Sequence, residues 1–208
     1  MKKKFTIIFI VTLLILGALC LTYIQNIPYE NVRISYAKTD ISCHVDGSPP
    51  LDIQIEKNGT ISIGARNLKP SELKPIFKNA FERYGDDFPI ALHVDKDSKM
   101  SNVKSVVEEI LLAKGNAVWL VAKKENTGLY PFRSTIDIDN FKSKNVIELS
   151  GKNILLNNAN ADLNKIEEYV HGDLFDGITK IICSENVLYQ DLINVLSICR
   201  YDIEFIIK

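Results

Sequence analysis

The chain has 208 residues, of which 25 are basic and 26 acidic, and its formal net charge is −1 at pH 7. Because no long block of one sign occurs, the sequence lacks the basic face of a nucleic-acid-binding protein, and we expect no nucleic-acid partner. About 180 residues follow an apolar N-terminal stretch, which is enough for one ordinary domain or two small ones.

The apolar stretch covers residues 5–24, which are uncharged and follow Met1 and three lysines. About twenty such residues in a helix, at a rise of 1.5 Å per residue, cover the ~30 Å hydrocarbon core of a bilayer. Cytoplasmic segments tend to be lysine-rich, so residues 1–4 should stay in the cytoplasm and send the rest of the chain outward. We therefore expect a transmembrane anchor over 5–24, followed by a linker over 25–50.

Two other interpretations of this stretch stay open. A cleaved signal peptide needs a shorter apolar region and a small-x-small site, whereas this run continues to Ile24. Lipid attachment needs a small residue before the cysteine, but Leu19 precedes Cys20. An ion-conducting span usually needs an ionisable group, and this stretch has none. We predict a plain anchor, and Thr6 and Thr12 are the candidates for packing against partner helices if the chain is part of a membrane complex.

Residues 51–124 predict one compact ββαβαβ domain. Period-two alternation on both sides of Asn58-Gly59 indicates a hairpin. Ser71 is the expected N-cap of a first helix that ends at Gly85, and a second helix should run from about Ser101 to Gly115. Strands are expected over 89–94 and 117–121. The helices should bury these apolar stripes: Leu73, Ile76, Phe77, Ala80, Phe81 and Tyr84 in the first, and Val103, Val106, Val107, Ile110 and Leu111 in the second.

The same order returns over residues 145–208, after a bridge over 125–144 that contains Pro131. Because the two copies lie about 90 residues apart, we interpret them as an internal duplication. The predicted fold class is α+β: an N-terminal transmembrane helix followed by two tandem ββαβαβ domains, each a sheet with two helices. The elements expected in the second copy are a hairpin around Gly151, a helix capped by Asp162, a strand over 178–183, a helix over 188–199 and a strand over 203–207.

The sequence contains no recognisable catalytic or metal-binding constellation. His44, His93 and His171 are far apart, and there is no nucleophile elbow, Walker loop, HExxH or CxxC pair. The adjacent pair Cys43-His44 has no second pair of ligands to complete a tetrahedral shell. We therefore predict that the protein is not an enzyme and uses neither a metal nor a cofactor.

The strongest candidate for a functional cluster is Asp95, Lys96 and Asp97, which follow the predicted strand 89–94. An acidic loop in this position binds a cation or a partner, or it caps the next helix. The equivalent loop of the second copy has different chemistry, which favours the structural interpretation for both loops.

Four further residues are interpreted as structural. His93 alternates with apolar neighbours and should lie on the less buried face of its strand, and Trp119 should pack in the core. Cys183 and Cys199 should be small core residues. A disulfide between these two cysteines is the alternative.

These features resemble the ExbD/TolR biopolymer-transport family. The resemblance rests on a short cytoplasmic start, one span, and a tethered domain that reads DIQIEKNGTISI and then HVDKDSKMSNVKSVVEEILLAKGNAVWLV. In that family a strand ending in Ala-Asp-Lys, a helix with a Val-Val-x-Val-like stripe and a glycine followed by a strand recur in this order. Here Val94-Asp95-Lys96, residues 103–112 and residues 115–121 take these places. The likeness covers roughly residues 1–124 and is fainter over 145–208.

The resemblance implies an inner-membrane protein with its domains in the periplasm, working as a dimer inside a ring of polytopic ExbB/TolQ-type subunits. The family's span carries an aspartate for proton coupling, and residues 5–24 carry none. The family's single domain occurs twice here, which would build a dimer-like pair within one chain. We expect a component or accessory of such an energy-transducing complex that does not itself conduct protons, with self-association as a further contact. The alternative is an anchored periplasmic module that binds peptidoglycan or a protein peptide, without a motor role.

Overall fold

The structure is a computed structural model that describes residues 36–37, 50–86, 88–124, 128–136, 145–170, 179–199 and 203–208. The expected anchor over 5–24, with Thr6 and Thr12, lies outside these residues. Within the described ranges, no helix combines the length and apolarity needed to cross a bilayer. The chain divides into the units Met1–Glu30 and Asn31–Lys208, and every described residue belongs to the second unit.

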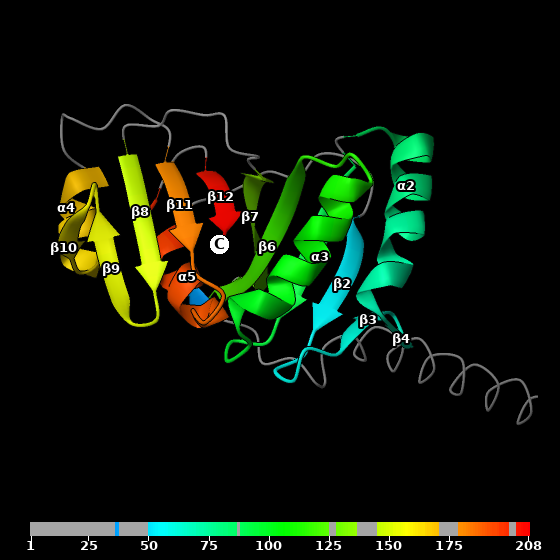
Figure 1. Ribbon diagram of the computed structural model, residues 1–208, viewed down its shortest axis with the longest axis horizontal. Coiled ribbons are helices and arrows are strands. Elements are labelled where there is room, and N and C mark those ends of the chain that lie inside the picture. Colours follow the sequence, from blue (N-terminus) through cyan, green and yellow to red (C-terminus); the bar gives the residue numbers. More distant parts are fainter. Residues whose placement is uncertain are drawn as a thin grey trace, which may run out of the picture. The chain divides into compact units, whose positions relative to one another are not determined.

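The two halves of this unit contain the same strands and helices in the same order (Figure 1). The predicted order ββαβαβ is confirmed in both halves, with one additional strand after each hairpin. The first half contains β2 (Leu51–Ile55), β3 (Ile61–Ile63), β4 (Arg66–Leu68), α2 (Leu73–Tyr84), β5 (Ile90–Val94), α3 (Met100–Leu112) and β6 (Ala117–Lys124). The second half contains β8 (Asn145–Ser150), β9 (Asn153–Leu156), β10 (Ala159–Ala161), α4 (Leu163–Val170), β11 (Thr179–Cys183), α5 (Tyr189–Leu196) and β12 (Ile203–Ile207).

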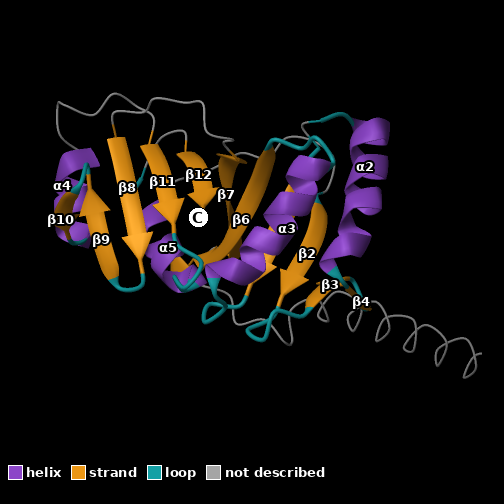
Figure 2. Cartoon of the chain, viewed as in Figure 1, coloured by secondary structure: helices purple, strands orange, loops and turns teal. Residues whose placement is uncertain are grey.

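The strands of both halves form one continuous sheet in the order β10-β9-β8-β11-β12-β7-β6-β5-β2-β3-β4. In each half the middle strand, β5 or β11, lies parallel between two neighbours, and the hairpin strands are antiparallel. Parallel neighbours need crossover connections, and the helices are part of these connections. In Figure 2, α2 and α3 lie in front of the sheet, whereas α4 and α5 lie behind it.

The segment predicted as a bridge over 125–144 contains a strand, β7 (Gly128–Ile136), so the expectation of a mere connection was wrong there. β7 pairs antiparallel with β6 along its whole length and parallel with β12 over Ser134–Ile136. Pro131 made the segment look unlike a strand, because proline cannot donate to a ladder. Pro131 lies outside the stretch that pairs with β12, and a strand tolerates a proline at such a position. β7 thereby joins the two halves into one sheet.

Short polar strands were also missed by the sequence reasoning. β4 and β10 have three residues each, which is too short for an alternating pattern to be recognised in the sequence. Asn157 and Asn158 both adopt positive φ, 51° and 68°, in the turn between β9 and β10. This pair of left-handed asparagines is the signal for a two-residue hairpin turn. In the linker, Tyr36–Ala37 forms β1, which pairs parallel with the end of β6.

The helix starts were predicted with mixed success. Asp162 caps α4 as expected, because its Oδ1 accepts the Lys165 N–H at 2.9 Å. Ser71 is not the N-cap of the first helix but lies inside a 3-10 turn, Pro70–Glu72, that precedes α2. There Glu72 accepts the Lys69 N–H at 2.8 Å, and this hydrogen bond lowers the pKa of the Glu72 carboxyl. Pro70 occupies the first position of this 3-10 turn, a position that favours proline, so the helical conformation begins before Ser71.

The core is formed largely by the predicted stripes. Adding 89 to a buried residue of α3 gives a buried residue of α5 or of the turn after it, which supports the duplication at the level of single residues. The predicted stripe residue Tyr84 is instead exposed and stacks on Phe88 with ring centroids 4.8 Å apart, and Leu188, the first residue of the helix expected over 188–199, is exposed as well. The equivalent buried pairs are Met100 and Tyr189, Val103 and Leu192, Val106 and Val195, Val107 and Leu196, and Ile110 and Cys199.

Gly115 was expected to close the second helix, and the residue before it, Lys114, takes the left-handed conformation at the end of α3, with φ 71°. The Gly115 N–H closes the helix end by donating to the Ile110 carbonyl at 2.9 Å. A Cβ on Gly115 would lie 2.5 Å from Cζ of Phe81 and 2.7 Å from Cγ2 of Ile110. Glycine is therefore required at this position by close packing between α2 and α3.

We predict that Gly115→Ala lowers the free energy of unfolding by about 1–3 kcal/mol, because the added methyl group overpacks the core. Lys114→Gly is the matched control and should leave stability equal or higher, since it relieves a left-handed non-glycine residue. Urea unfolding of both variants tests this. Equal stability of Gly115→Ala and the parent chain would contradict the packing argument.

Candidate functional site

The predicted cluster Asp95-Lys96-Asp97 forms the loop between β5 and α3, and its first member is buried at 2% exposure. Oδ1 of Asp95 accepts the Asp97 N–H at 2.9 Å, which closes a local turn, while Lys96 and Asp97 are half-buried. Within the described residues, no group of three or more His, Cys, Asp or Glu side chains is placed to hold a metal ion. The Asp95 carboxylate thus shapes the loop.

The N-terminus of α3 is capped by the other half of the chain. The N–H groups of Met100 and Ser101 donate to the carbonyls of Val187 and Glu185 at 2.8 and 2.9 Å. The first N–H groups of a helix have no partner within it, so an outside acceptor must supply one. Here the loop between β11 and α5 supplies the acceptors.

The N-terminus of α5 is capped in the reciprocal way. The N–H groups of Tyr189 and Gln190 donate to the carbonyls of Ser98 and Lys96 at 2.9 and 3.0 Å. The two sets are related by a shift of 89 residues: the donors of the second set lie 89 residues after those of the first, and its acceptors lie 89 residues before those of the first. A bridge between Lys99 and Leu188, also 89 residues apart, lies at the centre. We call this arrangement the reciprocal junction, with residues 96–101 and 185–190 as its two sides.

Two side-chain contacts reinforce the reciprocal junction without obeying its symmetry. The fully buried Tyr189 donates its hydroxyl to the Val121 carbonyl on β6 at 3.1 Å, and burial raises the pKa of its phenol. Lys104 on α3 donates to Glu185, and this hydrogen bond raises the pKa of the lysine. The first contact anchors α5 to the sheet of the first half, and the second ties α3 to the loop of the second half.

His93 lies in the interior, with 3% exposure, so the prediction that it occupies the less buried face was wrong. Its Nε2 lies 2.9 Å from Oδ1 of Asp52, which is half-exposed on β2. Asp52 pairs with Ala91, so His93 is its diagonal neighbour two residues on. The sequence signal for this contact was two polar residues at same-face positions of strands that become neighbours. Trp119, expected in the core, is half-buried.

Cys183 and Cys199 are both buried free thiols, which confirms the core interpretation and not the disulfide alternative. Burial raises the pKa of the Cys199 thiol to about 12, although a hydrogen bond with Thr179 opposes the shift. Burial also raises the pKa of Cys183 far above its ordinary value. Both groups are therefore unreactive thiols in the folded chain.

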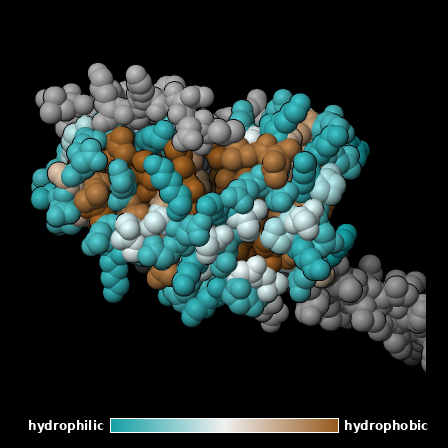
Figure 3. Space-filling model, in the orientation of Figure 1, coloured by the Kyte–Doolittle hydropathy of each residue, from teal (hydrophilic) through white to brown (hydrophobic). Residues whose placement is uncertain are grey.

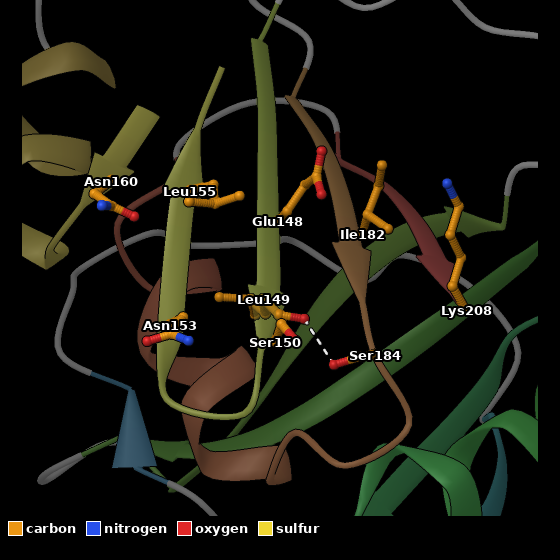
Figure 4. Close-up of a pocket in the computed structure, with 9 residues that line it drawn as sticks. All are labelled: Glu148, Leu149, Ser150, Asn153, Leu155, Asn160, Ile182, Ser184 and Lys208. Carbon is orange, nitrogen blue, oxygen red and sulfur yellow. Dashed lines mark hydrogen bonds between the residues drawn. The ribbon is translucent and has the colours of Figure 1, made fainter. Parts of the chain in front are cut away.

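A pocket of about 540 Å³ lies on the face of the second half that is opposite its helices (Figure 4). Its polar groups are hydroxyls, amides, one carboxylate and one ammonium, beside leucine and isoleucine side chains. Ser184 donates to the Leu149 carbonyl at 3.1 Å, which fixes one wall. No sequence motif pointed to this pocket, because its residues come from separate strands whose pairing is not local. The lining residues are Glu148, Leu149, Ser150, Asn153, Leu155, Asn160, Ile182, Ser184 and Lys208.

The chain matches no protein-family model, no curated protein and no solved structure. The geometry of the reciprocal junction and of the pocket therefore carries the functional argument.

We predict that Tyr189→Phe lowers the free energy of unfolding by about 1–2 kcal/mol, because it removes a hydroxyl that satisfies a buried carbonyl. Tyr84→Phe is the matched control, since the Tyr84 ring is exposed, and it should change nothing measurable. Thermal and urea unfolding of the two variants provide the comparison. Equal effects of both substitutions would show that the Tyr189 hydroxyl does not hold the junction.

Cys183 and Cys199 should resist iodoacetamide in the native state and react fully in urea, as read by mass spectrometry of the digested chain. Because folding raises both thiol pKa values, the folded state gains stability below the ordinary thiol pKa of about 8.5 and loses it as the pH rises above that value. Rapid native alkylation of either cysteine, or stability that is constant from pH 7 to 10, would contradict the burial of these thiols.

Proposed function

We propose that the chain is a membrane-anchored, non-enzymatic component or accessory of an ExbB/TolQ-type envelope complex, with residues 31–208 in the periplasm. The reciprocal junction is the observation that carries this proposal. Subunits of the family that the sequence resembles work as dimers, and here two repeats are paired within one chain. In a twofold dimer interface both subunits contribute equivalent residues to the contact, and the two sides of the reciprocal junction are equivalent in the same sense.

The span supplies the second part of the argument. Residues 5–24 have the length of a bilayer-crossing helix and contain no ionisable side chain. A chain of this kind would join the complex through helix packing, with Thr6 and Thr12 as the polar contacts, and would leave proton conduction to other subunits. The proposed role is therefore to present a fixed pair of periplasmic domains beside the motor.

The test is extraction of the tagged full-length chain in mild detergent, followed by native mass spectrometry. We expect a polytopic partner in stable ratio, and we expect its loss when 5–24 is replaced by an unrelated apolar span of equal length. Thr12→Asp should also release the partner, because a buried charge would oppose helix packing, whereas Thr12→Val is the mild control.

Extraction of the parent chain as a monomer or homodimer alone would overturn the motor role. Retention of partner and activity after the span exchange would do the same, since any anchor would then suffice.

A second candidate is an anchored periplasmic module that binds a protein peptide or peptidoglycan without a motor. The pocket on the second half favours this candidate, because it offers both apolar and polar groups on an accessible face.

A further inference from the structure

The residues on the sheet face opposite the helices of their own half are buried in the first half and partly exposed in the second. In the first half Ala91 and His93 on β5 are 2% and 3% exposed. Their counterparts 89 residues on, Lys180 and Ile182 on β11, are both half-buried. Figure 3 shows apolar surface on the side of the molecule where β8 and β11 lie. The two halves thus share their strands, but among the described residues the equivalent face is less deeply buried in the second half.

The pocket residues form two rows that cross neighbouring strands. In the first row Leu155 pairs with Glu148, and Glu148 pairs with Ile182. In the second row Asn153 pairs with Ser150. Ser184 and Lys208 follow β11 and β12, and the Lys208 N–H donates to the Cys183 carbonyl at 2.8 Å. Figure 4 shows Glu148, Ile182 and Lys208 following one another across the strands.

The charges of the pocket are separated by an apolar side chain. Among the described residues, neither Glu148 nor Lys208 takes part in a salt bridge. Glu148 lies on β8 and Lys208 directly follows β12, so two strand spacings, about 10 Å, separate their backbones across the sheet. Ile182 lies on the strand between them. A ligand that satisfies this arrangement carries one positive and one negative group about 10 Å apart, with apolar surface between.

The chemistry of the lining selects among ligand classes. No aromatic side chain lines the pocket, so it lacks the stacking surface that nucleobases need. A single lysine does not make the cationic cluster that a polyphosphate would need. The amides of Asn153 and Asn160 and the hydroxyls of Ser150 and Ser184 match the donors and acceptors of a peptide backbone. A peptide in polyproline II conformation places residues i and i+3 on one side, about 9 Å apart.

We propose that this pocket binds an extended peptide segment in which a basic and an acidic residue are three positions apart and flank apolar residues. The basic side chain pairs with Glu148, the acidic one with Lys208, and the apolar residues between them contact Ile182. This inference refines the binding-module candidate above and does not need the motor complex. Because the peptide lies on a face and not at a sheet edge, its backbone adds no strand to the sheet.

The test measures binding of three labelled peptides to the full-length chain in detergent by fluorescence anisotropy. The peptides share the frame Gly-Ser-X-Leu-Pro-Z-Ser-Gly with blocked ends, where X and Z are Lys and Glu, Lys and Lys, or Glu and Glu. The parent chain should bind the Lys/Glu peptide about three- to tenfold more tightly than the other two, as expected for partly exposed charge pairs.

Charge reversal should redirect this preference in opposite ways. Glu148→Lys should bind the Glu/Glu peptide best, and Lys208→Glu should bind the Lys/Lys peptide best. Glu167→Lys and Lys74→Glu change the net charge equally at exposed helix positions, so both should keep the preference of the parent chain.

Three results would overturn the proposal: no binding of any peptide at millimolar concentration, the same order of preference in all variants, or binding to isolated peptidoglycan with no peptide preference. If a pocket variant fails to fold, an NMR measurement on the parent chain still tests the proposal. The Lys/Glu peptide must shift the amide NMR signals of Ser150 and Ser184 and leave those of Gln54 and Val94 in place. A stable polytopic partner without any peptide preference would overturn this inference and leave the motor role standing.

Discussion

The structure of residues 31–208 depends on a constraint at two helix ends. The first N–H groups of α3 and α5 cannot be satisfied within their own helices, and neither N-cap residue, Lys99 or Leu188, offers a side-chain hydrogen bond. Each helix instead takes its acceptors from the loop that precedes the other. Because Met100 and Tyr189 are fully buried, separating the halves would leave these N–H groups and two large side chains in need of new partners. The pairing of the repeats is therefore part of the folding of each repeat.

The same pairing also explains where the two halves are free to differ. The backbone contacts of the reciprocal junction use carbonyls and N–H groups, which any side chain leaves available. The two loops therefore make the same backbone contacts with different side chains. One loop contains Asp95-Lys96-Asp97, and the other contains Ser184-Glu185-Asn186. β7 lies between β6 and β12 and has no counterpart among the described strands, and the pocket with Glu148 and Lys208 lies in the second half. Duplication supplies the scaffold, and these departures supply a candidate function.

Local patterns in the sequence predicted the elements well because their causes are local. The turn at Asn58-Gly59, the cap at Asp162 and the helical stripes each arise within a dozen residues, and the structure has all of them. What could not be predicted depends on partners distant in sequence. The carbonyl of Lys96 became an acceptor for Gln190, Pro131 entered a strand, and His93 became buried beside Asp52. The pocket joins β8, β9, β11 and the end of the chain, so no single segment could reveal it.

The most direct test of this account is native-state hydrogen exchange at the junction amides of Met100, Ser101, Tyr189 and Gln190. The account predicts that all four exchange only through the opening that also exposes the amides of β5 and β11, with one shared opening free energy. In that case both halves unfold as a single cooperative unit. Fast exchange of these four amides, or separate opening free energies for β5 and β11, would contradict the claim that reciprocal capping holds the two repeats together.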